Sequence, residues 1–505
     1  MVLAVSPSIF RPSRLLYTGC LAMLLLTQLP ACSTGDGHNT QDATTGGDNT
    51  GTGANNDDTG NNISSPDQQL YADAATLYSQ KLYDSSEVLL DQILLEYATG
   101  FMVDDAHYLK GKIAYRRDDF VTAKAEFAIV ITQYPSSDLV DNAIYWTGKT
   151  EHAQGHYDAA RSQYQMVLSN YPDSDYLESS RYELAKSYFD EGGTTPPDAG
   201  KINLAIAGFR DILINHGTSI KADDAQYFLA RSFHELNDYA SARGEYQIMW
   251  DTYPDSTWRD NAQYQIGRTY YHEADVLASA TPSATAAEVN NKLASAISAF
   301  ELLLSSYPGS GSADTAQYYL GRSYQQLQPP DFLQARDHFS IMIANYATSV
   351  FVDNAQLQLG RSYYSDAIAN NDATLFTTAL TELNKVLTHY PGSNSADNAQ
   401  LYIGKSYHKR GIANLDAADL VNARSAYLQL LADYPASTLR DNAALRIGET
   451  YHDAGNNNLG TDNCTQEKIQ MQWVIDNFPG STSAAGAQTH LDGAAAVDAD
   501  HGFCP

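Results

Sequence analysis

One phrase of sequence recurs ten times along this chain, and it constrains the fold more than any other feature. Each copy has an anchor that is aromatic, or once His, and a small residue nine positions later, which is Ala everywhere except at Ser180. The anchors are Tyr97, Tyr134, Tyr171, His216, Tyr253, Tyr307, Tyr346, Tyr390, Tyr434 and Phe478. Clear copies read Tyr-Pro-x-Ser, then Asp-Asn-Ala and Gly, as from Tyr134 to Gly148. A phrase with a period of 37 to 54 residues indicates a stack of similar units rather than one globular core.

A second set of positions completes the unit. Twelve positions after Gly148 comes Ala160, followed by Tyr164 and Pro172. This Ala recurs in register in eight copies, as Ala123, Ala160, Ala205, Ala242, Ala296, Ala335, Ala379 and Ala423. The pattern resembles the tetratricopeptide repeat, in which a small residue and an aromatic residue lock a two-helix hairpin that Pro ends. The resemblance implies an all-α fold, a right-handed superhelical solenoid of about ten tetratricopeptide-like helical hairpins with a capping helix.

Each position of the phrase has an expected physical role. The Ser three positions after the anchor, such as Ser137, should cap the first helix by accepting a backbone N–H. The acidic residue four positions further, such as Asp141, complements the helix dipole. An aromatic residue of the second helix fills the space left by the small residues, and Pro closes the unit.

Longer copies carry extra residues between the Gly and the next Ala. These insertions lie near residues 191–200, 274–290, 366–374, 410–418 and 454–463. We expect them to form loops inside the hairpins that project from one edge of the solenoid, where partner contacts are often found. Neutral variation in loop length is the alternative for each insertion.

The N-terminus has the features of a secretory signal. Two Arg precede an apolar run from Leu15 to Leu29, and no acidic residue occurs before it. The stretch ends in Leu-Pro-Ala-Cys, which resembles the lipobox of bacterial lipoproteins and implies cleavage before Cys32 and lipidation of that residue. A plain signal peptide followed by an incidental Cys is the alternative.

The chain therefore divides into four parts. Residues 33–66 are rich in Gly, Asn, Thr, Asp and Ser, a composition that cannot bury enough apolar surface to fold. The parts are a lipoprotein signal peptide (1–31), the lipidated Cys with a disordered tether (32–66), the repeat solenoid (67–491) and a C-terminal tail (492–505).

Two further cysteines, Cys464 and Cys504, lie beyond the eighth regular unit. The last unit is degenerate, with Glu467 and Met471 where Ala and an aromatic residue are expected. An oxidising compartment permits a disulfide between Cys464 and Cys504, which would stabilise a terminal unit that lacks a neighbour on one side. Two unpaired thiols are the alternative.

Charge and motifs exclude several functions. The net charge is −29 at pH 7, which argues against nucleic acid and anionic lipid headgroups as partners. The sequence has no phosphate-binding loop, nucleophile elbow or His-Glu-x-x-His motif, so we expect no enzyme activity, no cofactor and no metal site. Four His share one repeated position, but neighbouring units should hold them about 10 Å apart, too far for shared coordination at ~2 Å. They are His152, His234, His408 and His452.

A basic residue follows the Gly position in eight units. We call these residues the basic row: Lys112, Lys149, Lys186, Arg231, Arg268, Arg322, Arg361 and Lys405, with Glu449 breaking the run. An acidic residue stands eight positions before each cation, so ion pairing within or between adjacent units is the first interpretation. The second is a stripe that binds an acidic peptide or a carboxylate, as carboxylate-clamp versions of this repeat do.

The repeat phrase behind a lipobox resembles the tetratricopeptide lipoproteins of the bacterial envelope. The nearest types are the BamD-type component of outer-membrane barrel assembly and the CpoB/YbgF type linked to the Tol system. The resemblance implies a protein-binding scaffold, lipid-anchored in the outer membrane and facing the periplasm, whose partners are proteins or peptides of the cell envelope. We expect a role in outer-membrane protein assembly. Coordination of cell-wall synthesis with the Tol system and self-assembly as a surface repeat protein are the alternatives.

Overall fold

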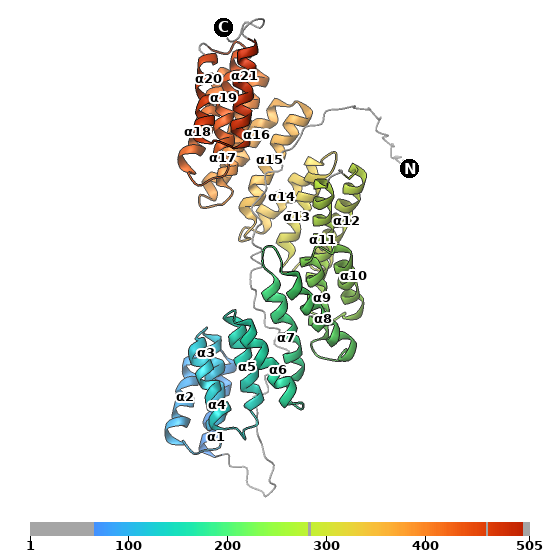
Figure 1. Ribbon diagram of the computed structural model, residues 1–505, viewed down its shortest axis with the longest axis vertical. Helices are drawn as coiled ribbons and strands as arrows, with labels where there is room; N and C mark the ends of the chain where they lie inside the picture. Colours follow the sequence, from blue (N-terminus) through green and yellow to red (C-terminus); the bar gives the residue numbers. More distant parts are fainter. Residues whose placement is uncertain (1–64, 281–283, 461–462, 498–505) are drawn as a thin grey trace, which may run out of the picture. The chain divides into compact units, whose positions relative to one another are not determined.

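The structure is a computed structural model that describes residues 65–280, 284–460 and 463–497, and every regular element in these ranges is an α-helix (Figure 1). The helices are α1 (Pro66–Ser79), α2 (Tyr83–Glu96), α3 (Val103–Arg116), α4 (Phe120–Gln133), α5 (Val140–Ala153), α6 (Tyr157–Asn170), α7 (Leu177–Gly192), α8 (Ala199–Asn215), α9 (Ala222–Glu235), α10 (Tyr239–Thr252), α11 (Arg259–Ser279), α12 (Ala286–Ser306), α13 (Ala313–Gln326), α14 (Phe332–Asn345), α15 (Val352–Asn370), α16 (Ala373–His389), α17 (Ala396–Asn414), α18 (Ala417–Asp433), α19 (Arg440–Asn456), α20 (Asn463–Asn477) and α21 (Thr482–Val497).

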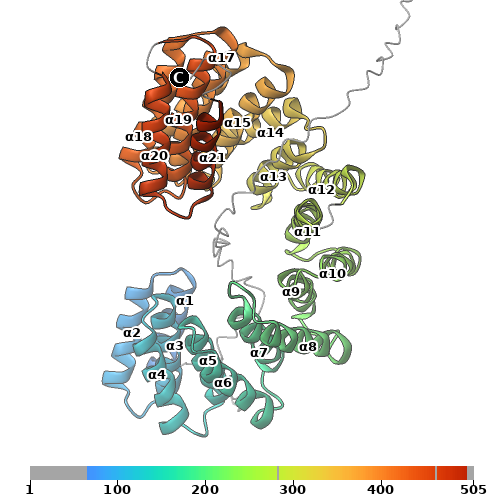
Figure 2. The ribbon, with the colours of Figure 1, turned by 45° about the horizontal axis from the view of Figure 1, so that its top comes forward.

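The helices pair along the chain into hairpins. In the described ranges ten hairpins run from α1 with α2 to α19 with α20, and α21 packs against both helices of the last one. The second helix of each hairpin also packs against the first helix of the next, so neighbouring hairpins lie side by side, as Figure 2 shows for α9 to α12. This arrangement confirms the expected all-α solenoid of about ten hairpins with a capping helix.

The small residues of the first helix let the second helix approach closely. A Cβ on Gly111 of α3 would clash with the buried ring of Phe127 on α4. Gly321 of α13 stands in the same relation to Phe339 on α14. An aromatic ring therefore fills the space left by the small residue, as the repeat pattern predicts. The anchors end the second helices, as Tyr134 does at the C-cap of α4.

The recurring Ser does not cap the first helix. Ser437 Oγ accepts a hydrogen bond from the Leu439 N–H at 3.1 Å, but Leu439 is itself the N-cap residue of α19. The expected capping role is wrong because the helix begins later than the Ser. The same hydroxyl instead donates to Asp397 Oδ2 of the preceding unit at 2.6 Å, and Ser393 donates to Asp353 Oδ2 at 2.5 Å. The acidic residue of the phrase thus links its own helix to the next unit.

Asp105 on α3 stands where most clear copies of the phrase carry Asn, and it is buried. Burial and the neighbouring charges of Asp104 and Asp138 raise the pKa of its carboxyl from 3.8 to about 7. Since the folded pKa is the higher one, stability is greatest below the unfolded pKa and falls as the pH rises towards the folded pKa. We expect Asp105→Asn to raise the free energy of unfolding by about 1–2 kcal/mol at pH 8 and to change it little near pH 4. Thermal unfolding of both chains at the two pH values measures the difference. Equal effects at the two pH values would show that the buried charge is not the cause.

The insertions mostly lengthen helices instead of forming projecting loops. α11 and α12 each have 21 residues, against 14 in α3 and α4, and they take up most of the 274–290 insertion. Ala274 and Val289 on the added turns are buried. The 366–374 and 410–418 insertions are also largely helical. The expectation of loops is wrong at these sites because the added apolar residues continue the buried face of each helix.

Several expected features lie outside the described residues, namely the signal peptide, Cys32, residues 33–64 of the tether and Cys504. The expected end of the tether at residue 66 is wrong, because Pro66 already begins α1. Cys464 on α20 takes part in a disulfide, and its pairing with Cys504 stays a prediction. The expected boundary at residue 491 falls inside α21. No helix in the described ranges combines the length and the apolar character needed to cross a bilayer.

Candidate functional site

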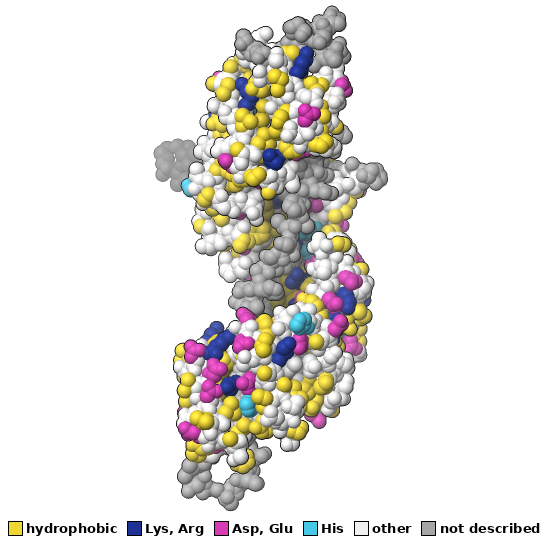
Figure 3. Space-filling view, turned by 60° about the vertical axis from the view of Figure 1, so that its left-hand side comes forward, with side chains coloured by type: hydrophobic (Ala, Val, Ile, Leu, Met, Phe, Trp, Pro, Cys, Tyr) yellow, Lys and Arg dark blue, Asp and Glu magenta, His cyan; other side chains and the backbone are white. Residues whose placement is uncertain are grey.

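The basic row lies on the first helices of eight consecutive hairpins, from Lys112 on α3 to Lys405 on α17. Lys112 is buried and the other seven side chains are half-buried. Because the small residue before each cation faces the second helix, the cation itself lies beside the first helices of neighbouring units. On the face drawn in Figure 3, acidic and basic side chains are interspersed over the part formed by the N-terminal helices.

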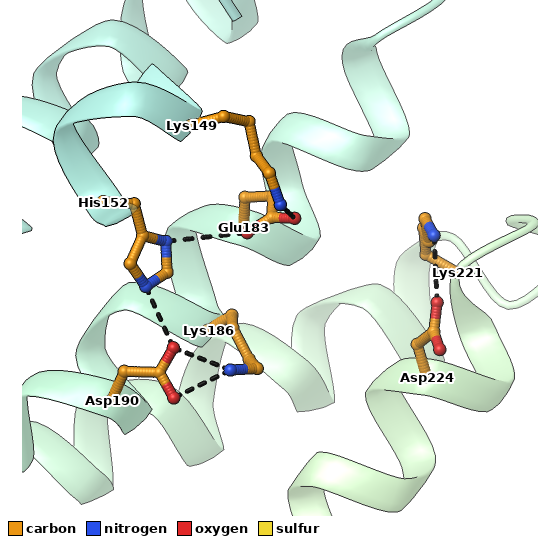
Figure 4. Close-up of polar contacts among 7 residues, drawn as sticks. All are labelled: Lys149, His152, Glu183, Lys186, Asp190, Lys221 and Asp224. Carbon is orange, nitrogen blue, oxygen red and sulfur yellow. Dashed lines mark hydrogen bonds and ion pairs between the residues drawn. The ribbon is translucent and has the colours of Figure 1, made fainter. Parts of the chain in front are cut away.

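Carboxylates of α7 neutralise two cations in the N-terminal half of the row, Lys149 from the preceding hairpin and Lys186 on α7 itself (Figure 4). Lys149 Nζ on α5 donates to Glu183 Oε1 on α7 at 2.7 Å. His152, one turn further along α5, contacts Asp190 Oδ2 at 2.9 Å. Lys186 donates to both carboxylate oxygens of Asp190, at 2.7 and 2.6 Å. We call these five residues the charge network, since they join two repeat units through ion pairs.

The members of the charge network hold one another in the charged state. Although burial opposes ionisation, the charge of Lys149 and the hydrogen bond from His152 hold the pKa of Glu183 well below its usual range. Burial also opposes protonation of His152, but its contacts with Asp190 and Glu183 raise its pKa. The two row cations here, Lys149 and Lys186, are therefore already paired within the fold.

Aromatic rings are neighbours of other cations in the row. Lys112 Nζ lies 5.2 Å from the ring centre of Tyr78 on α1 and 5.3 Å from that of Trp146 on α5. The guanidinium of Arg231 lies 5.2 Å from the ring centre of Phe189. Such contacts attract a cation by about 0.5–2 kcal/mol, so aromatic side chains of the repeat also stabilise the row.

The C-terminal half of the row gathers positive charge around one ring. Arg361 on α15 and Lys405 on α17 lie over the Tyr402 ring, at 4.8 and 4.6 Å from its centre. In the part of the chain that the structure describes, neither cation has a carboxylate within ion-pair distance. Arg446 on α19 adds a third positive charge and donates to Glu449 Oε2 at 2.7 Å. We call Arg361, Lys405 and Arg446 the basic cluster.

The pKa shifts of Lys405 and Tyr402 both reflect nearby positive charge. Burial and the charges of Arg446 and Arg361 lower the pKa of Lys405, although Tyr402 acts in the opposite direction. Burial alone would raise the pKa of Tyr402, yet the charges of Arg361 and Lys405 lower it. A positive field therefore dominates at this point of the solenoid, and it favours the binding of a carboxylate or another anion.

The sequence identifies the basic row but not the partners of its members. Asp141 stands eight positions before Lys149, yet the structure pairs Lys149 with Glu183 of the next unit. Arg446 lies outside the register of the row, and the break at Glu449 was the one sequence signal that the pattern changes there. Which charges meet depends on contacts between units, and the spacing within a unit does not encode these contacts.

Comparison with known families agrees with the repeat assignment. The family described as outer membrane lipoprotein, YfiO, matches residues 137–235 and 312–450, which include the charge network and the basic cluster. The tetratricopeptide repeat family TPR_6 matches residues 105–137 and 224–256. The chain is thus a tetratricopeptide-repeat protein that resembles the BamD-type envelope lipoproteins. No curated protein matches it.

Several solved helical-repeat structures are similar at low identity. The C-terminal part of a TPR repeat-containing protein from Cytophaga hutchinsonii is 15% identical, with a TM-score of 0.43 over 59% of this chain and 98% of that chain. A tetratricopeptide repeat protein from Parabacteroides merdae is 12% identical, with a TM-score of 0.36 over 61% and 98%. The human IFIT1 dimer with PPP-AAAA is 15% identical, with a TM-score of 0.39 over 77% and 82%. Similarity at this level says nothing about the partners of this chain.

Proposed function

We propose that this chain is a lipid-anchored, non-enzymatic scaffold that binds proteins or peptides of the bacterial envelope in outer-membrane protein assembly. The partial match to the outer membrane lipoprotein family supports the compartment. The lipobox-like sequence that ends at Cys32 supports a lipid anchor, and the family match supports the outer membrane as its place, with the solenoid facing the periplasm. Stacked helical hairpins support a binding role, since such solenoids expose extended surfaces.

The observation that carries the binding role is the basic cluster. Its cations come from three successive first helices, α15, α17 and α19, and two of them lack a carboxylate partner among the described residues. An acidic peptide segment or a C-terminal carboxylate supplies the missing negative charge, and the guanidinium of Arg361 can bind it through two parallel hydrogen bonds. Because the chain as a whole is strongly acidic, this local field selects where an acidic partner can bind.

Combined substitution of Arg361→Ala and Lys405→Ala tests this binding site. We expect the affinity of the purified chain for an acidic peptide with a free C-terminus to fall about ten-fold, because two of the three charges are lost. Fluorescence anisotropy with a labelled peptide measures the change. Lys385→Ala is the matched control, since Lys385 is paired with Glu382 and lies outside the row. An unchanged affinity in the double variant, or an equal loss in the control, would argue against the site.

A test of the proposed role in outer-membrane assembly requires the natural partner in the native envelope. We expect crosslinking of the lipidated chain in native envelopes, followed by mass spectrometry, to recover an outer-membrane barrel with its assembly components. The Arg361→Ala, Lys405→Ala variant should recover less of them. If peptidoglycan synthases or Tol components are recovered instead, the assembly role is wrong and coordination of cell-wall synthesis is favoured. Crosslinks between copies of this chain alone would favour self-assembly.

A further inference from the structure

Three metal-ligating side chains converge in the last unit, one from each of its helices. His452 lies on α19, Glu467 on α20 and His490 on α21. Glu467 Oε1 lies 3.0 Å from His452 Nδ1 and 3.2 Å from His490 Nδ1. The two imidazole rings are 5.2 Å apart between centres, and the three ligand atoms all lie within 4.8 Å of one another.

Glu467 occupies a position that carries Ala in the eight regular units and Ser86 in the first unit. In the eight regular units this Ala packs in the core between the two helices, and each of them is fully buried. Glu467 is also buried, with a side chain only 4% exposed. A buried carboxylate is costly unless it is paired or binds a metal. The change from Ala to Glu therefore places a negative charge whose ion-pair partners, among the residues that the structure describes, are the two His, and a cation held with them would compensate it as well.

We propose that His452, Glu467 and His490 form a Zn²⁺ site that fastens α21 to the last hairpin. Two imidazole nitrogens and one carboxylate oxygen are a ligand set that Zn²⁺ prefers. Ligands of a tetrahedral ion at about 2.1 Å from the metal lie about 3.4 Å apart, close to the spacing of these atoms. The side chains of His452 and His490 are 38% and 28% exposed, so solvent reaches the site and water can supply a fourth ligand.

The proposed site is not a row of His residues at equivalent positions, which the spacing between units excludes. The sequence predicts no metal site because His residues at equivalent positions of successive units, such as His408 and His452, should lie too far apart to bind one ion. His408 contacts Asp453 Oδ2 at 2.9 Å and takes no part in the site. The proposed ligands come from three non-equivalent positions, which only the packing of α21 against α19 and α20 brings together.

Titration of the purified full-length chain with Zn²⁺ tests the proposal. After removal of metal with a chelator, we expect calorimetry to show about one Zn²⁺ per chain at micromolar affinity or tighter, and thermal unfolding to shift upward by a few degrees. Co²⁺ should give the visible absorption of a tetrahedral complex. The Glu467→Ala variant should lose both responses, with an affinity weaker by about 100-fold. This variant restores the repeat's own residue, so we expect it to fold.

Two further variants make the outcome decisive. His490→Asn removes a second ligand and should give the same loss, while His156→Gln removes an exposed His from another unit and should change nothing. All variants keep the same cysteines and the same acidic N-terminal segment, so adventitious binding there is common to every titration. Zn²⁺ binding that is unchanged in Glu467→Ala and His490→Asn, or absent from the unsubstituted chain, would overturn the proposal and leave a metal-free set of His–Glu ion pairs.

Discussion

Glu183→Gln is expected to lower the free energy of unfolding by about 3 kcal/mol at pH 7, because it leaves the half-buried Lys149 without its carboxylate and removes one of the two carboxylates beside His152. Glu183 is 10% exposed and accepts a hydrogen bond from Lys149, which is 22% exposed. Its second oxygen lies 3.6 Å from His152 Nδ1. Guanidinium unfolding followed by circular dichroism measures the loss.

The same substitution at a surface pair provides the control. Glu87 accepts a hydrogen bond from Arg117, and both side chains are 34% exposed. Solvent screens this pair, so we expect Glu87→Gln to cost about 0.5 kcal/mol at most. Adding Lys149→Met to Glu183→Gln should recover part of the lost stability, because it removes the cation that the first substitution deprives of its carboxylate. Equal losses at Glu87 and Glu183 would mean that burial does not strengthen the network.

The effect of Glu183→Gln also has a defined pH dependence. Since the pKa of Glu183 is depressed in the folded chain, its contribution is complete above the unfolded pKa of about 4.5 and is lost as the pH falls towards the folded value. The difference between the unsubstituted chain and Glu183→Gln should therefore be full at pH 7 and shrink in strongly acidic buffer. A difference that stays constant down to about pH 2 would show that the loss does not arise from the carboxylate charge.

Gly321→Val is expected to destabilise the chain by about 3 kcal/mol, because it overpacks a core that has no free space. A Cβ on Gly321 would lie 2.6 Å from Cε1 of Phe339, whose ring is fully buried. Replacing Gly in a helix otherwise gains up to about 1 kcal/mol, so the clash must exceed this gain. Thermal unfolding measures the net result.

Gly244→Val is the matched control for this prediction. Gly244 lies in α10 and is exposed, and no atom lies within 4 Å of the place where its Cβ would stand. We expect this substitution to stabilise the chain by about 0.3–0.5 kcal/mol through helix propensity alone. Opposite signs for Gly321→Val and Gly244→Val would show that contact with the second helix, rather than the residue type, makes Gly necessary at the repeat position.

The repeat spacing predicts local structure well and contacts between units poorly. The positions of Gly321 and Phe339 in their phrases predict that they meet, because both belong to one hairpin. The partner of Ser437 is Asp397 of the preceding unit, and the partner of Lys149 is Glu183 of the next. The phrase shows that these residues recur in each unit. It does not specify how neighbouring units are oriented, and this orientation determines which residues contact each other.

The repeat type, the helical hairpin, the close contact of Gly with the aromatic residue and the position of the basic row all follow from the sequence alone. They depend on periodicity and on side-chain size within one hairpin, where the chain connects the residues that touch. The packing between units, in contrast, selects which charges of the row are neutralised and leaves Arg361 and Lys405 without a carboxylate among the described residues. It also brings His452, Glu467 and His490 together. These sites combine side chains from different helices or units, so the packing of one helix on another determines their geometry.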